Sequence, residues 1–121
     1  MTGRAIFAAW LILASVTAVA HHSPANFNLG VTDFAVTGTI GSVSFRNPHS
    51  VIELNVPAPD GAVTQWYIEF SSVNLLLRRG WDLDRIAVGD TVTCIGNPSH
   101  NGAPEMYMWT IALDDGTEFG R

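Results

Sequence analysis

The residues with the clearest capacity for chemistry are four histidines, at His21, His22, His49 and His100. The first two directly follow Ala18-Val19-Ala20, a small-residue stretch typical of a signal-peptide cleavage site. Cleavage after Ala20 would leave an α-amine, two imidazoles and the intervening peptide nitrogen at one chain end. Imidazole suits copper, zinc and nickel, and square-planar nitrogen coordination selects Cu(II) or Ni(II). The pattern therefore predicts a site for a copper-type ion, with zinc or nickel less favoured.

Two ligand arrangements remain open. The α-amine and imidazole of His21 could chelate together, with His49 completing a three-nitrogen site. Alternatively, the α-amine would act with the deprotonated amide and the ring of His22. An α-amino group titrates near pH 8, so a metal displaces its proton at modest cost. His100 lies in a Gly/Asn-rich loop and is the weakest candidate. The competing interpretation is that His21, His22 and His100 are solvated and that His49 is a turn residue.

The first 20 residues have the three regions of a secretory signal peptide: Arg4, an apolar run from Ala5 to about Val16, and the small-residue end. The apolar run is short for a membrane-spanning helix, which needs about 20 residues. An uncleaved anchor is the alternative. We expect export, a periplasmic location and no stable membrane span after cleavage. Residues 21–32, which contain Pro24 and Gly30, are expected to form an extended arm.

Residues 33–121 are predicted to form one all-β domain. Alternation and β-branched residues predict five strands, at residues 33–45, 50–56, 63–70, 91–95 and 105–113. Ser71-Ser72 can cap a short helix over residues 73–79, and Gly80 can end it. The order of three strands, one helix and two strands is that of the OB-fold, a small five-stranded barrel.

In an OB-fold the loops between strands one and two and between strands four and five flank the ligand face. His49 lies in the first loop and His100 in the second, so both are expected to face the arm. Alternation in the third strand predicts Ile68 pointing inward, with Tyr67 and Glu69 outward.

The composition excludes several function classes. The chain has no lysine and six arginines against eleven acidic residues, and loss of Arg4 would change its net charge from −5 to −6. Such a chain is a poor nucleic-acid binder. Its one cysteine, Cys94, cannot form an intrachain disulfide and is expected to be a buried, inert thiol. The sequence contains no phosphate loop, nucleotide fingerprint or placed nucleophile, so we expect metal handling rather than catalysis.

Several ordered motifs resemble those of a family of small secreted bacterial proteins, domain of unknown function 6152. The motifs are Ala20-His21-His22-Ser23, Asn47-Pro48-His49, Trp66-Tyr67-Ile68-Glu69, Arg79-Gly80-Trp81 and Gly89-Asp90-Thr91-Val92. The resemblance implies a secreted, single-domain protein with no established activity. Three histidines fall on the family's motif positions and His100 does not, while Asn28 stands where an acidic residue is expected.

Two further functions compete with metal binding. One is a metal-free periplasmic module that binds an oligosaccharide, a peptide or an envelope protein, an idea motivated by the outward Tyr67. The other is a mononuclear copper oxidoreductase, in which an open coordination position activates oxygen. The oligomeric state is left open, because an exposed strand edge could pair with a second chain.

Overall fold

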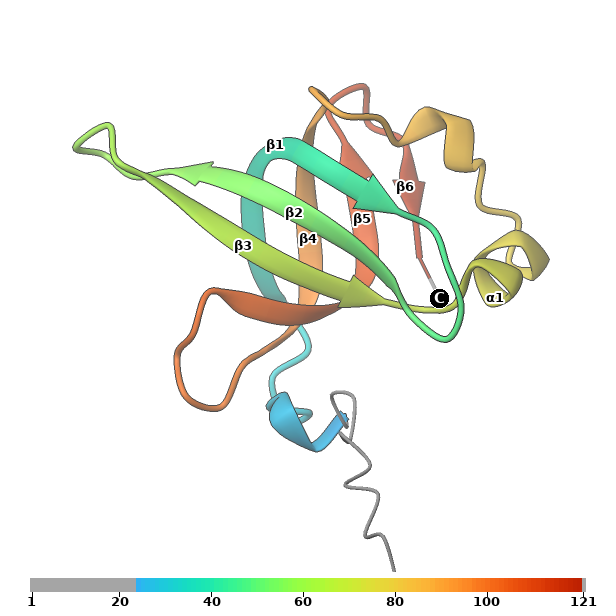
Figure 1. Ribbon diagram of the computed structural model, residues 1–121, viewed down its shortest axis with the longest axis horizontal. Coiled ribbons are helices and arrows are strands. Elements are labelled where there is room, and N and C mark those ends of the chain that lie inside the picture. Colours follow the sequence, from blue (N-terminus) through green and yellow to red (C-terminus); the bar gives the residue numbers. More distant parts are fainter. Residues whose placement is uncertain (1–23, 121) are drawn as a thin grey trace, which may run out of the picture.

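Stretches rich in β-branched and aromatic residues form the strands of the computed structural model, which describes residues 24–120 (Figure 1). The elements are β1 (Phe34–Ser44), β2 (Ser50–Pro57), β3 (Val63–Phe70), α1 (Val73–Arg78), β4 (Thr91–Pro98), β5 (Glu105–Leu113) and β6 (Glu118–Phe119), with 3-10 turns at Pro24–Asn26 and Leu83–Arg85.

The strands run in the order β3-β2-β1-β4-β5-β6, and an additional β3–β5 pairing closes the first five into a barrel. The closing pair is parallel and short: Tyr67, Ile68 and Glu69 lie opposite Glu105, Met106 and Tyr107. All other pairings are antiparallel. The chain order and the helix between β3 and β4 confirm the predicted OB-like barrel.

Glycines allow β1 to bend sharply enough to pair with both β2 and β4. A Cβ atom at Gly38 would lie only 2.5 Å from the carbonyl oxygen of Asn55, so a side chain has no room there. The β1–β2 register shifts between Ile40 and Ser42, which places Gly41 in a bulge.

The barrel interior holds one apolar core. Its fully buried members include Ile40, Ile52, Leu54, Ile68, Met106 and Ile111. Cys94 belongs to this core, and burial raises the pKa of its thiol to about 12, as expected of an inert cysteine. Trp81 closes one barrel end by stacking on Phe70 and Phe119, at ring-centroid distances of 6.1 and 5.5 Å.

Three sequence-based expectations are corrected. The described part of the arm includes a 3-10 turn at Pro24–Asn26, where extended chain was expected. β4 does not stop at Ile95 but continues through Pro98, because β5 is long enough to pair with Asn97 and Pro98. The short edge strand β6 was not expected. Within residues 24–120, no helix is long and apolar enough to cross a membrane.

Candidate functional site

His49 lies at the end of the β1–β2 loop, which the start of α1 holds in place. The Val73 amide donates to the carbonyl oxygen of Arg46 at 3.0 Å, and the Asn74 amide donates to Asn47 Oδ1 at 3.5 Å. The buried Ser50 hydroxyl accepts from the Arg46 amide at 3.3 Å. These bonds tie the loop to rigid elements at both ends, so the His49 backbone is fixed relative to the barrel.

The imidazole of His49 is paired with the carboxylate of Glu69 on β3, with 2.5 Å between Nδ1 and Oε1. The Glu69 side chain is 4% exposed and that of His49 37%. A buried carboxylate is stable only with a hydrogen-bonding partner, and an ionised one can only accept. With Glu69 ionised, the proton between the two atoms belongs to Nδ1, and in the neutral ring Nε2 carries the lone pair.

Glu69 lies on the outer barrel face, as the alternation of the third strand predicted, but it is buried there. Its neighbours Ile68 and Phe70 point inward. That face is covered at this point, because Glu69 lies between Val51 on β2 and Tyr107 on β5. The carboxylate is therefore enclosed by neighbouring strands that lie far from it in sequence.

An aromatic cluster connects His49 to the N-terminal arm. The His49 ring meets Tyr107 edge-on, with centroids 6.2 Å apart. Tyr107 in turn contacts Phe27 of the arm at 6.0 Å and Trp109 at 4.7 Å. Phe27 is 2% exposed, so the arm is anchored to this outer face at that residue.

A cleft of about 300 Å³ opens beside the pair. Its lining residues are Arg46, Asn47, Pro48, His49, Val51, Tyr67 and Glu69. The lining therefore combines apolar surface with one guanidinium, one imidazole and one carboxylate. A small ligand or a metal-bound solvent molecule could enter it.

His100 lies on the β4–β5 loop and is exposed. Its backbone amide donates to the carbonyl oxygen of Asn26 at 3.2 Å, so this loop contacts the arm, as the OB-fold placement predicted. In the described part of the chain, residues 24–120, no three His, Cys, Asp or Glu side chains converge into a metal-ligand group. His21 and His22 lie outside the described residues.

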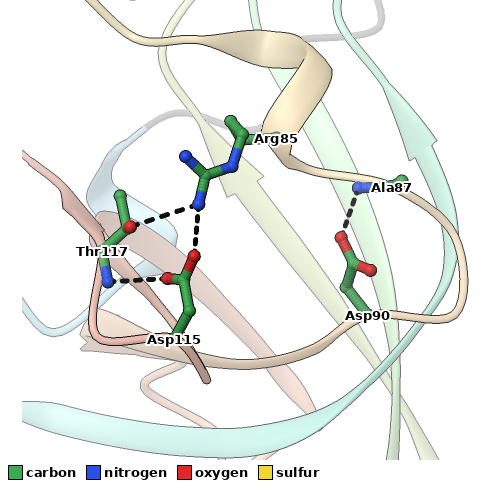
Figure 2. A network of polar contacts seen from close by, with 5 residues as sticks. All are labelled: Arg85, Ala87, Asp90, Asp115 and Thr117. Atoms are coloured by element: carbon green, nitrogen blue, oxygen red, sulfur yellow. Dashed lines mark hydrogen bonds and ion pairs between the residues drawn. The ribbon is translucent and has the colours of Figure 1, made fainter.

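A second polar region lies where residues 85–90 approach the turn between β5 and β6. The two carboxylates drawn there already have hydrogen-bonding partners (Figure 2). Asp115 pairs with Arg85 and also accepts from the Thr117 amide at 2.9 Å. Asp90 accepts from the Ala87 amide at 2.9 Å. These carboxylates fasten loops together, and we assign them a structural role.

Sequence reasoning missed Glu69 and the aromatic pair Tyr107 and Trp109. One signal was available: Tyr107 and Trp109 alternate with the core residues Met106 and Met108, which puts two large aromatic side chains on the outer face of one strand. Two such side chains on a barrel exterior indicate that something covers it.

The sequence model of a family of unknown function (DUF6152) matches residues 8–106. The chain therefore belongs to this family, as its motifs suggested. No match to the chain was found among curated proteins or among solved structures.

Proposed function

We propose that this member of the DUF6152 family binds a late transition-metal ion, Cu(II) in preference to Zn(II) or Ni(II), with Nε2 of His49 as one ligand. The observation that supports the proposal is the close contact of His49 Nδ1 with the buried Glu69 carboxylate, at 2.5 Å. Metal-binding histidines usually donate their other ring N–H to a carboxylate or carbonyl, which fixes the tautomer and makes the ligating nitrogen more basic.

The remaining ligands would come from the segment before the arm. Phe27 contacts Tyr107, and Tyr107 contacts His49, so the arm approaches the His49 face. His21 lies six positions before Phe27, a stretch that would span about 20 Å if fully extended and spans less with the 3-10 turn at Pro24–Asn26. The α-amine and ring of His21, or the amide and ring of His22, can therefore reach a metal on His49. Both arrangements remain open.

The donor set favours copper. Amine and imidazole nitrogens in a planar arrangement suit Cu(II) and Ni(II), and copper forms the stronger complexes. The proposal includes cleavage after Ala20 and export to the periplasm, since the α-amine of His21 exists only after cleavage. His100, on the exposed β4–β5 loop, is the weakest ligand candidate, and neither arrangement uses it.

The test uses protein exported through its own signal. Intact mass and N-terminal sequencing establish the first residue, and Cu(II) titration followed by electron paramagnetic resonance reports affinity and nitrogen ligation. We expect a chain that begins at His21 and a tight, nitrogen-rich copper signal. His49→Ala should weaken binding at least 100-fold, and Glu69→Gln about 10- to 100-fold. A loss of the same size in His21→Ala selects the arrangement that uses the His21 ring, whereas a loss in His22→Ala selects the other.

His100→Ala is the matched control, because it removes an imidazole from a loop that also contacts the arm. It should leave the affinity unchanged. One residue added before His21 tests the role of the α-amine. If the His49→Ala protein binds copper as tightly as the unchanged chain, the proposal is wrong.

The cleft favours one second candidate, a metal-free module for a small ligand or an extended segment of an envelope partner. Val51, Pro48 and Tyr67 offer apolar contact and Arg46 a positive charge. Under this function, Tyr67→Ala and Arg46→Ala would abolish partner capture by the metal-free protein, whereas His21→Ala would not alter it.

A further inference from the structure

We propose that two copies of this chain associate through the open edge of β3, pairing residues Val63–Gln65 antiparallel about a two-fold axis at Thr64. This inference is independent of the metal site. The β2–β3 hairpin extends away from the barrel, and no described strand lies along the β3 side of its outer half (Figure 1). β5 pairs with β3 only from Tyr67 to Glu69.

The backbone groups that face this edge can be identified from hydrogen bonds on both sides of β3. The Ala58 amide donates to the Ala62 carbonyl at 2.7 Å, so Ala62 faces β2. The Tyr67 amide instead donates to the Pro104 carbonyl at 2.9 Å, so Tyr67 faces away from β2. Successive residues of a strand alternate in this respect. The N–H and C=O groups of Val63 and Gln65 therefore point to the open edge.

This arrangement is complementary to itself. When two copies of the strand run antiparallel with Thr64 opposite Thr64, each Val63 lies opposite the other copy's Gln65. Both residues direct their N–H and C=O groups to the partner, so each pair exchanges two hydrogen bonds and the interface has four. The two threonines form a close, non-hydrogen-bonded pair, a cross-strand arrangement found in stable sheets.

The edge also lacks the features that normally prevent such pairing. Open edges usually carry charged residues, proline or a bulge. The segment from Ala62 to Trp66 has none of these, and its β2 pairing continues without a register shift. Val63 is 63% exposed, and Thr64 and Gln65 are exposed too. Although the whole chain is acidic, no like charges would meet at this contact.

We assign a second copy of the chain as the partner of this edge. In the symmetric register, all the N–H and C=O groups that Val63 and Gln65 direct to the open edge form hydrogen bonds with the other copy. A two-fold contact of this kind closes on itself and does not propagate into a fibre. Since only three residues of each chain pair, the interface is small, and we expect a reversible dimer with a dissociation constant in the micromolar to millimolar range, as for contacts at the low end of interface size.

The test is analytical ultracentrifugation of the processed, metal-free chain from about 10 μM to about 1 mM, a range chosen to bracket the affinity expected of a small interface. We expect the mass to rise from monomer towards dimer. Thr64→Lys and Thr64→Glu should each weaken association at least tenfold, because like charges then face each other on the axis. An equimolar mixture of these two variants should restore it. Thr39→Lys, an exposed strand substitution away from this edge, should have no effect.

A second measurement does not depend on affinity. Thr64→Cys places two thiols across the axis at the short Cα distance of a non-hydrogen-bonded pair, which suits a disulfide. This variant should cross-link under mild oxidation, whereas Thr39→Cys should not. A protein that stays monomeric to about 1 mM, a dimer that the charged variants leave unchanged, or equal cross-linking of the two cysteine variants would each overturn the proposal.

Discussion

Asn97 donates a hydrogen bond of 2.6 Å from its side-chain Nδ2 to the carbonyl oxygen of Val31, and thereby joins β4 to the end of the arm that leads into β1. Its Oδ1 accepts from the indole Nε1 of Trp109 at 2.5 Å. The Asn97 side-chain amide, in a residue that is 1% exposed, thus connects the arm, β4 and β5.

Asn97→Ala removes both bonds and leaves the Val31 carbonyl and the Trp109 indole without this partner. We expect the free energy of unfolding to fall by about 1–3 kcal/mol, the usual effect of leaving partly buried polar groups unsatisfied. Urea denaturation followed by tryptophan fluorescence measures this. Asn101→Ala, on the exposed β4–β5 loop, is the control and should have a smaller effect. Equal losses for the two variants would contradict a special role for Asn97.

Cys94 should be unreactive in the folded protein. Its side chain is 0% exposed, and burial raises the pKa of its thiol to about 12. A thiol reagent at pH 8 should therefore modify the chain only after denaturant is added. Rapid labelling of the native protein would show that the core opens around β4.

The same thiol should make stability depend on pH in the alkaline range. The pKa is about 12 in the folded chain against a model value of 9.0, so the thiol's contribution is constant below pH 9 and is lost as pH rises towards 12. Between pH 8 and pH 10.5 the free energy of unfolding of the unsubstituted protein should fall by about 2 kcal/mol more than that of the Cys94→Ala variant. Denaturant titrations at the two pH values test this, and identical pH dependence of the two proteins would refute it.

Asp115 should titrate below the ordinary range of an aspartate. The Thr117 backbone amide is the main cause of the lowered pKa, with smaller contributions from the Thr117 hydroxyl and the Arg85 guanidinium (Figure 2). At pH values above the ordinary pKa of an aspartate, the ionised Asp115 side chain stabilises the folded protein. This contribution is lost as the pH falls through the lowered pKa. Arg85→Ala should raise the titration midpoint only partly, as measured by carboxyl NMR, because the Thr117 amide remains. Complete return to the ordinary value would contradict this ranking of causes.

Gly96 is required by the close approach of β4 and β5. A Cβ atom there would lie 2.0 Å from the Tyr107 carbonyl oxygen and 2.9 Å from the Met108 Cα, both backbone atoms. Gly96→Ala should therefore lower the free energy of unfolding by at least about 3 kcal/mol, the upper range for overpacking. Gly30→Ala, where the nearest atom is the Asn28 side-chain oxygen at 3.3 Å, should change little. Thermal unfolding of the two variants compares them directly.

The sequence predicted most of the fold because local patterns carry most of it. The bounds of β3 and β5 were predicted to the residue, and Ser72 accepts from the Leu75 amide as a helix cap should. The end of β4 was misjudged, since Pro98 looks like a loop residue until its partner strand is known. Pairing between strands distant in sequence decides such boundaries.

The candidate site was predicted only in part, for the same reason. His49 and its loop follow from Asn47-Pro48 and the OB-fold order, but the partner of His49 does not. Glu69 looks exposed from alternation and is buried only because β5 closes the barrel beside it. The roles of His21 and His22 remain predictions, as do the boundaries at residues 20 and 32.

The short parallel contact between β3 and β5 has a consequence for how the chain folds. β1, β2 and β3 pair with their neighbours in sequence, whereas β4 must return to β1 and β5 must return to β3. Such non-local contacts cost chain entropy before the hydrogen bonds and apolar burial that offset it are formed. We therefore expect folding on the millisecond-to-second timescale of small barrels. The core gains its final wall when residues 105–107 pair with β3, so we expect this closure to be a late event in folding.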